Sequence, residues 1–157
     1  MKKHKQLALE NMISEATTSF DVSVESWQQA VLFAGDLLVK AGFVEARYPS
    51  AMVNWVTKLG PYVVIAPGVA LPHARPEDGA ITPCMSLITL KNPINFGNQS
   101  NDPVKLVIAF ATTDPDSHVM ALSKLARVLE EPERIEDLKN TIQFETVAKL
   151  MKTGSKA

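Results

Sequence analysis

Short apolar runs alternate along this chain with longer segments in which apolar residues recur every three or four positions. The short runs have the length of buried strands, and the longer segments have the spacing of amphipathic helices. This alternation predicts one α/β domain, covering 1–157, in which helices cover a sheet of four or five strands. The expected strands are 62–66, 85–90 and 104–111, and the main expected helices are 24–40, 48–59 and a segment opening at 114–116.

Capping residues place the ends of these helices. Ser23 is expected to cap the helix at 24–40, and the proline of Tyr48-Pro49 suits the first turn of the next one. Asp114 or Asp116 can cap the third helix. Two shorter helices are expected from Pro132 and from Phe144, the last ending at Gly154.

The remaining segments are less regular. A short amphipathic helix is expected at 9–16, followed by a short extended segment at 17–22. The stretch 67–76 is too proline-rich for a regular element, and Asn92-Pro93 predicts a turn after the strand at 85–90.

Composition excludes several classes of protein. The net charge of −1 lacks the basic surplus typical of nucleic-acid binders. Cys84 is the single cysteine, which rules out an intramolecular disulfide and a multi-cysteine metal site, and its place at the start of an apolar run favours a packed core thiol. No apolar run approaches the roughly 18 residues of a membrane span, and no apolar stretch follows the basic start, so a cytoplasmic location is expected.

Histidine is the residue type that best suits chemistry here. His4 lies near the terminus and is a poor candidate, whereas His73 and His118 each follow an expected strand. Pro72 and Pro76 restrict the backbone on both sides of His73. A neutral imidazole can act as nucleophile toward a phosphoryl donor, and a second can donate a hydrogen bond to the transferring oxygens. Each histidine taken alone can equally be a surface or capping residue.

Other side chains near these histidines can hold an anion. Arg75 lies two residues from His73, and it is either a phosphate or partner ligand or a solvated loop charge. Arg47, before the second helix, has the same status. Thr112, with Thr113, can contribute hydroxyl donors beside the helix that carries His118. Capping explains the acids near His118, so we expect no metal and no cofactor.

The run at 68–76, GVALPHARP, resembles the phosphorylation-site motif of enzyme IIA domains from the mannitol/fructose (type 2) class of the sugar phosphotransferase system (PTS). The order and spacing of the other elements are similar over about residues 9–150. The longer match from GPYVVIAPG at 60–68 to HARPEDG at 73–79 is similar to the ascorbate-type branch of that class.

The resemblance implies a three-layer α/β/α fold with a mixed sheet of about five strands. It implies that His73 takes phosphate from the carrier protein HPr, that His118 assists, and that a cysteine of an enzyme IIB is the next acceptor, serving a membrane IIC permease. Mannitol-type members carry an arginine in the helix before the histidine loop, where this chain has Asn54, Trp55 and Val56. We therefore hypothesise that Arg75 or Arg47 takes that arginine's electrostatic role.

Two other functions stay open at this point. A regulatory IIA-like module would use the same site to signal its phosphorylation state to a target protein. A non-catalytic α/β binding domain would carry these histidines incidentally. The substrate is equally open, because a IIA domain does not touch the sugar: ascorbate or a related sugar is a branch-level expectation. The oligomeric state is not predicted.

Overall fold

The centre of the molecule is one mixed sheet of five strands. The computed structural model describes residues 7–155. Along the sheet the strands follow the order β1-β4-β5-β3-β2, with β1 parallel to β4, β3 parallel to β5, and the other two pairs antiparallel. The strands are β1 (Thr18–Val22), β2 (Val64–Ala66), β3 (Val69–Ala70), β4 (Cys84–Ile94) and β5 (Val104–Ala111).

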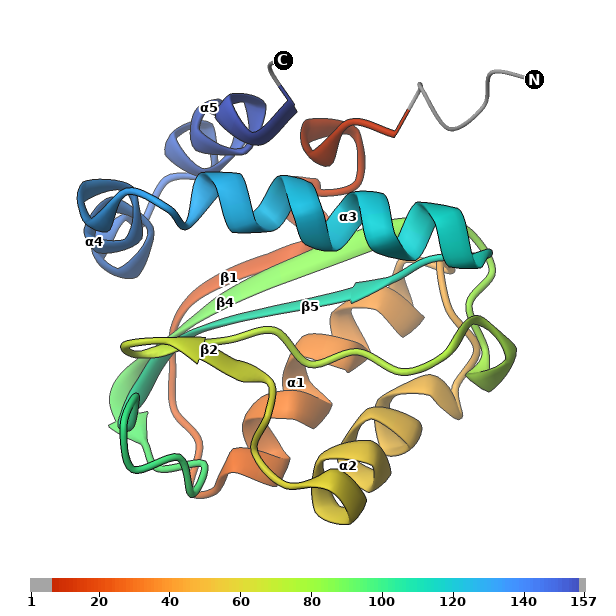
Figure 1. Ribbon diagram of the computed structural model, residues 1–157, viewed down its shortest axis with the longest axis horizontal. Coiled ribbons are helices and arrows are strands. Elements are labelled where there is room, and N and C mark those ends of the chain that lie inside the picture. Colours follow the sequence, from red (N-terminus) through yellow and green to blue (C-terminus); the bar gives the residue numbers. More distant parts are fainter. Residues whose placement is uncertain (1–6, 156–157) are drawn as a thin grey trace.

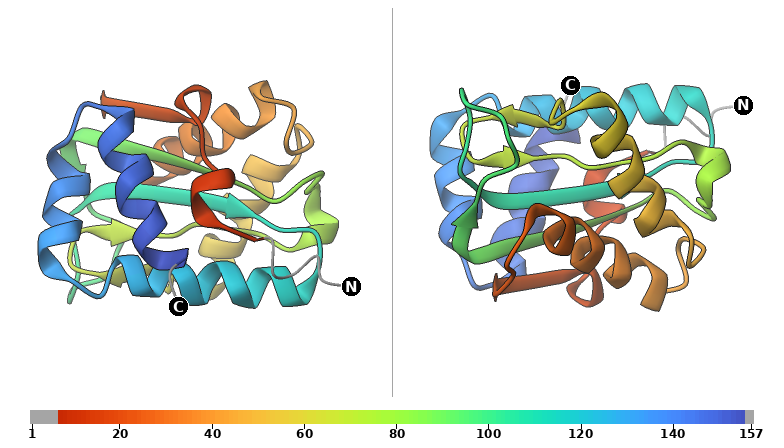
Figure 2. Two further views of the ribbon diagram at one scale, coloured as in Figure 1. Left: turned by 90° about the horizontal axis from the view of Figure 1, so that it is seen from above. Right: turned by 90° about the horizontal axis from the view of Figure 1, so that it is seen from below.

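Helices cover both faces of this sheet (Figures 1 and 2). One layer holds α1 (Trp27–Lys40) and α2 (Tyr48–Leu59), and the opposite layer holds α3 (Pro115–Val128) and α5 (Phe144–Ser155). The short α4 (Pro132–Asn140) joins α3 to α5. The expected three-layer α/β/α fold with a mixed five-stranded sheet is confirmed. Among residues 7–155, no helix has the length and apolar character to cross a membrane.

The two central strands explain the apolar runs of the sequence. In β4 and β5, successive side chains alternate between two buried clusters, one on each face of the sheet. Ile88 and Val107 pack toward α1 and α2, whereas Leu87 and Ile108 pack toward α3 and α5. Strands covered on both faces are therefore apolar at most positions, and each buried aliphatic side chain stabilises the fold by about 1.5–3 kcal/mol.

The N-terminal segment differs from the predicted helix. Residues 9–16 form two short 3₁₀ helices, η2 (Leu9–Asn11) and η3 (Glu15–Thr17), in place of one α-helix. The backbone between them is engaged by the sheet, because the Met85 N–H donates to the Met12 carbonyl at 2.8 Å. A carbonyl bound to β4 is not available to continue a helix. The extended segment after η3 is confirmed as β1.

Two helix ends also differ. α1 begins three residues later than expected because Ser26, not Ser23, is its cap, and the Ser26 hydroxyl accepts from the Gln29 N–H at 3.2 Å. α5 continues through Gly154. A Cβ at Gly154 would lie 2.5 Å from the Lys124 carbonyl oxygen. That glycine therefore permits the close approach of α5 to α3 and does not end the helix.

The segments around the strands contain more structure than the proline content suggested. β4 runs through Asn92 and Pro93, where a turn was expected, because its ladder with β5 shifts register between Thr89 and Ile94. Such an irregularity accommodates a residue without an N–H. Within 67–76, which was expected to be irregular, Val69–Ala70 pairs with β5 as β3.

Candidate functional site

His73 lies beside the end of β5, and the backbone around it pairs with that strand. It forms a parallel bridge with Phe110, and the Phe110 N–H donates to the Pro72 carbonyl at 3.3 Å. Its ring Nδ1 lies 2.8 Å from the Leu71 carbonyl oxygen. A carbonyl can only accept, so Nδ1 carries the proton and donates it, and Nε2 keeps its free lone pair. The loop thus fixes both the ring orientation and the tautomer.

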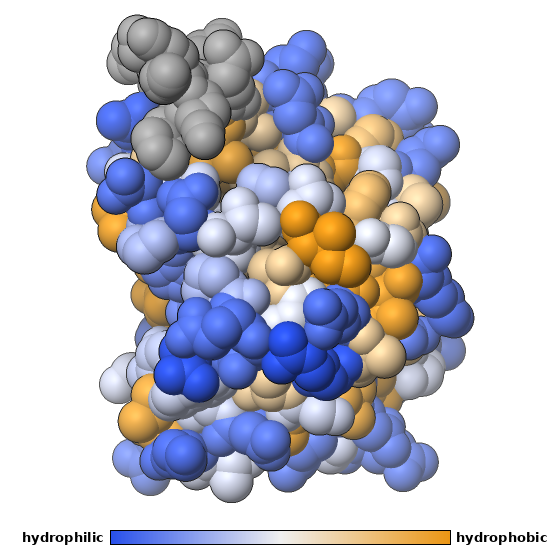
Figure 3. All heavy atoms as spheres, turned by 90° about the vertical axis from the view of Figure 1, so that its right-hand side faces the viewer, coloured by the Kyte–Doolittle hydropathy of each residue, from blue (hydrophilic) through white to orange (hydrophobic). Residues whose placement is uncertain are grey.

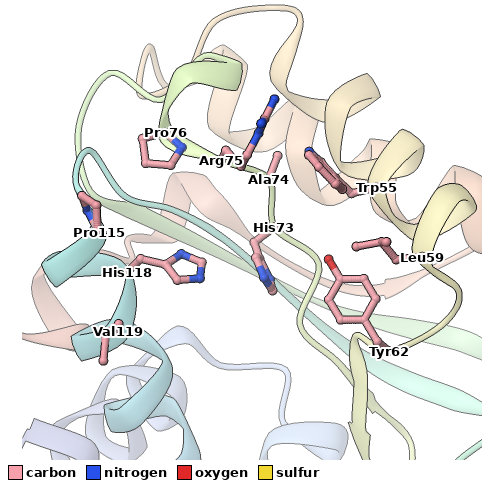
Figure 4. A pocket seen from close by; sticks show the side chains of 10 residues that line it. All are labelled: Trp55, Leu59, Tyr62, His73, Ala74, Arg75, Pro76, Pro115, His118 and Val119. Carbon is pink, nitrogen blue, oxygen red and sulfur yellow. The ribbon is translucent and has the colours of Figure 1, made fainter.

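The second histidine of the site comes from α3. The rings of His73 and His118 have centroids 5.1 Å apart at an interplanar angle of 59° (Figure 4). The ring of Phe110 lies against both, with centroids 4.8 Å from His73 and 5.6 Å from His118. The structure therefore brings together two histidines that are 45 positions apart in the sequence (118 − 73), on an aromatic floor supplied by β5.

The first turn of α3 is capped by one of its own acids. Asp114 is the cap, and its carboxylate accepts from the Ser117 N–H at 2.8 Å. The His118 N–H donates to the Asp114 carbonyl at 3.1 Å, and Pro115 has no N–H to offer. The N–H groups of Ser117 and His118 are thus already used, and the His118 side chain lines the same pocket as His73.

A buried tyrosine, Tyr48, is hydrogen-bonded to the loop that carries His73. The Tyr48 side chain is fully buried at the start of α2. Its hydroxyl accepts from the Ala74 N–H at 3.0 Å and donates to the Phe110 carbonyl at 2.9 Å. Burial raises the pKa of this hydroxyl well above its ordinary value, so it stays protonated. One side chain therefore ties α2 and β5 to the residue that follows His73.

Burial keeps both histidines neutral. It lowers the pKa of His73 below the usual 6.5; the hydrogen bond to Leu71 opposes this shift, and the nearby His118 adds to it. Burial also lowers the pKa of His118. At neutral pH the two rings are therefore uncharged, and the Nε2 lone pair of His73 is available for bonding.

The rings of His73 and His118 line a pocket of about 400 Å³ (Figure 4). Figure 3 shows the end of the molecule at the right of Figure 1, where apolar side chains gather beside a group of hydrophilic ones. Apart from the histidines and Arg75, the lining is mainly apolar or aromatic. It consists of Trp55, Leu59, Tyr62, His73, Ala74, Arg75, Pro76, Pro115, His118 and Val119.

Four of these lining residues were missed from the sequence. Trp55, Leu59 and Val119 lie on apolar stripes, which predict core positions. In the structure Val119 is 64% exposed and Leu59 is 59% exposed. Tyr62 lies just before β2, with its ring edge toward His73 at a centroid distance of 6.1 Å. The sequence predicted Tyr62 as the first residue of a strand, and nothing in the pattern marked it as a pocket residue.

The other candidate residues have different surroundings. Arg75 lines the pocket. Arg47 does not; its guanidinium donates to Glu45 at 2.7 Å. Thr112 is 2% exposed, outside the pocket lining, and its hydroxyl has no hydrogen-bond partner among the described residues. Phosphate-binding roles for Arg47 and Thr112 stay predictions. His4 lies outside the described residues.

Two further sequence expectations concern metal and the cysteine. Within residues 7–155 no group of three or more His, Cys, Asp or Glu side chains is placed to hold a metal ion. Cys84 is buried, as expected of a core thiol. Burial raises the pKa of this thiol to about 12, which leaves it unreactive at neutral pH.

Comparisons with known proteins agree with this fold. The family model described as "Phosphoenolpyruvate-dependent sugar phosphotransferase system, EIIA 2" matches residues 11–154. The ascorbate-specific PTS system EIIA component of Escherichia coli (strain K12) is 37% identical over 131 residues, which cover 83% of this chain and 85% of that protein.

Two solved structures from Escherichia coli are also similar. The mannitol-specific cryptic phosphotransferase enzyme IIA CmtB has a TM-score of 0.81 and 34% identity, covering 93% of this chain and 99% of its own. The mannitol enzyme IIA in complex with phosphorylated enzyme IIB has a TM-score of 0.77 and 26% identity, covering 88% and 95%. With its two neutral histidines in one pocket and a family match over nearly its whole length, the chain belongs to the EIIA 2 family of the phosphoenolpyruvate-dependent sugar phosphotransferase system.

Proposed function

We propose that His73 carries the phosphoryl group and that its Nε2 is the atom that bonds to phosphorus. The observation that carries this proposal is the hydrogen bond from Nδ1 to the Leu71 carbonyl, which leaves Nε2 as the nucleophile. As the N–P bond forms, the bond between phosphorus and the donor breaks. The Nδ1 proton stays in place, and the carbonyl stabilises the positive charge that the ring then acquires.

His118 is the neighbouring group that assists. Its ring lies beside that of His73 and is half-exposed toward the same pocket. A ring N–H of neutral His118 donates a hydrogen bond to an equatorial phosphoryl oxygen, where charge accumulates during transfer. Arg75 supplies the positive charge at the pocket wall. Transfer of this kind needs alignment and charge stabilisation more than proton transfer, which fits a site with few polar groups.

Partners follow from the family and from its relatives. We infer that phospho-HPr is the donor and that a cysteine of an enzyme IIB is the acceptor, because a similar enzyme IIA has been solved with phosphorylated enzyme IIB. The relatives named as ascorbate-specific support ascorbate or a related sugar as the substrate of the whole system, which would include a membrane IIC permease. The carrier would act in the cytoplasm, where these partners meet.

The first test is phosphorylation in vitro. The protein is incubated with phosphoenolpyruvate, enzyme I and HPr, and its intact mass is measured. One acid-labile phosphate is expected on the wild type and none on His73→Gln, with circular dichroism showing that the variant is folded. His118→Gln should still be labelled, but more slowly. An unlabelled wild type, in a reaction that labels a known enzyme IIA, would refute the carrier function.

The second test addresses the acceptor. Purified phosphorylated protein is mixed with an ascorbate-type enzyme IIB and with the same enzyme IIB lacking its active-site cysteine. Loss of phosphate from this chain only with the intact enzyme IIB supports the assignment. Equal loss with both would show that the cysteine is not the acceptor.

A further inference from the structure

Arg75 is held on the face of a tryptophan at the edge of the pocket. Its guanidinium carbon lies 4.9 Å from the centroid of the Trp55 ring, within the range of a cation–π contact. Figure 4 shows the Arg75 side chain extending alongside Trp55 and away from His73. Both residues line the pocket. The arginine that lines the pocket therefore points away from the phosphoryl acceptor in the unphosphorylated protein.

Asp78 holds this arrangement together. A single carboxylate oxygen, Oδ2, accepts from the Trp55 indole N–H at 3.0 Å and from the Arg75 backbone N–H at 2.9 Å, and it lies 3.4 Å from the Arg75 Nε. The Asp78 side chain is 17% exposed, whereas that of Arg75 is 56% exposed. Burial opposes ionisation, but the hydrogen bonds from Trp55 and Arg75 outweigh it and lower the pKa of Asp78. Asp78 is thus the fixed partner, and Arg75 is the mobile one.

A phosphoryl group on His73 would change the balance of charge. Among the described residues that line the pocket, Arg75 is the only lysine or arginine. A phosphoryl group brings a charge of about −1.5 to −2 at neutral pH. In the unphosphorylated protein the Arg75 Nε lies near two carboxylates, 3.4 Å from the Asp78 Oδ2 and 3.5 Å from the Oε2 of the exposed Glu77. Planar guanidinium groups bind phosphate oxygens in pairs, which favours Arg75 over a more distant lysine.

The Arg75 side chain can approach a phosphoryl group on His73 while its backbone stays in place. Arg75 is two residues after His73, and its backbone is extended, with φ −86° and ψ 157°. Alternate residues of an extended segment point to the same side, with Cα atoms about 6–7 Å apart. Rotation about the side-chain bonds of Arg75 can therefore move its guanidinium from Trp55 toward His73. The intervening Ala74 stays buried and bonded to Tyr48.

We propose that Arg75 has two positions: Asp78 and Trp55 hold it while His73 is free, and it turns to the phosphoryl group once His73 is phosphorylated. This proposal rests on His73 being the phosphoryl acceptor. Trp55 and Asp78 are then positioning residues. They keep the cation beside the pocket, and Asp78 competes with the phosphoryl group for it, so the group is stabilised but remains transferable.

Nuclear magnetic resonance of the indole N–H tests the two positions. The Trp55 signal is assigned by comparison with Trp27→Phe, which removes the other tryptophan. ¹H–¹⁵N spectra are recorded before and after phosphorylation by phosphoenolpyruvate, enzyme I and HPr, with intact mass measured in parallel. We expect the Trp55 signal to move on phosphorylation of the wild type. In Arg75→Gln it should lie near the new position already and move little when His73 is phosphorylated.

The outcomes distinguish failure of this proposal from failure of the carrier function on which it rests. Absence of phosphate by mass would refute the carrier function, and the proposal with it. Phosphate by mass with an unmoved Trp55 signal would refute only the two positions. An equal shift in the wild type and in Arg75→Gln would also refute them, because the phosphoryl group would then act on Trp55 directly.

Transfer kinetics give a second, independent readout. Asp78→Asn keeps an oxygen acceptor for Trp55 but removes the charge that competes for Arg75. We expect it to lower kcat for transfer to enzyme IIB about tenfold, with KM for enzyme IIB unchanged, since a charged hydrogen bond contributes on this scale. The control is Lys58→Gln: its Nζ lies 5.6 Å from the same Trp55 ring but outside the pocket lining, so kcat should not change. An unchanged kcat in Asp78→Asn would overturn the competition.

Discussion

Removing the Tyr48 hydroxyl should both destabilise the protein and loosen its histidine loop. In Tyr48→Phe the ring still fills its fully buried position, but the Ala74 N–H and the Phe110 carbonyl lose their partner. Each hydrogen bond contributes about 1 kcal/mol net, and a buried donor without an acceptor adds a further cost. We expect the free energy of unfolding to fall by about 2–4 kcal/mol. Phosphorylation of His73 should also slow, because Ala74 directly follows it.

Urea denaturation followed by circular dichroism measures the first effect, and the rate of labelling by phospho-HPr under folding conditions measures the second. Tyr62→Phe is the matched control for stability: it removes the same hydroxyl from a side chain that is 44% exposed. That change should cost less than about 0.5 kcal/mol. If Tyr48→Phe proved as stable as Tyr62→Phe, the hydroxyl would not be the tie between α2, the loop and β5.

Three other perturbations have expected outcomes. Because burial lowers the pKa of His73, its NMR titration midpoint should lie below 6.5. Between that pKa and 6.5 the folded chain binds fewer protons than the unfolded chain, so the free energy of unfolding should decrease as pH falls through this range. The decrease should be less steep in His73→Gln. His118→Gln should raise the His73 midpoint, since it removes a nearby positive charge at acidic pH; an unchanged midpoint would contradict that coupling. Gly35→Ala should lower stability by about 1–3 kcal/mol in urea denaturation, because the added Cβ would lie 2.8 Å from atoms of Met52 and Pro49; full stability would show that α1 and α2 can separate at low cost.

Periodicity was enough to predict the layers of this fold but not the walls of its pocket. The runs that became β4 and β5 are mostly apolar on both of their faces, as strands covered on both sides require. Trp55 and Leu59 also lie on an apolar stripe, and the same pattern describes a buried face or the lining of a pocket. Only the position of the His73 loop across from α2 distinguishes the two.

The histidines themselves were recognisable because a short motif surrounds His73 and a capped helix carries His118. Their neighbours were not, since Trp55, Asp78 and Tyr48 act through contacts between segments far apart in the sequence. The prediction of a helix at 9–16 was wrong for a related reason. Whether 9–16 forms an α-helix depends on a hydrogen bond between Met12 and Met85, which no local pattern contains.

The parallel pairing of β3 with β5 also decides when the site can exist during folding. It joins residues 37 positions apart, as in Val69 with Leu106 (106 − 69), and the bridge between His73 and Phe110 extends the same pairing. Contacts this distant along the chain form only after the entropy of closing the intervening loop has been overcome, whereas α1 and α3 need only local contacts. A chain with its helices formed but this pairing open has both histidines and no site. The fraction of molecules that accept phosphate therefore measures the fraction in which β3 has paired with β5.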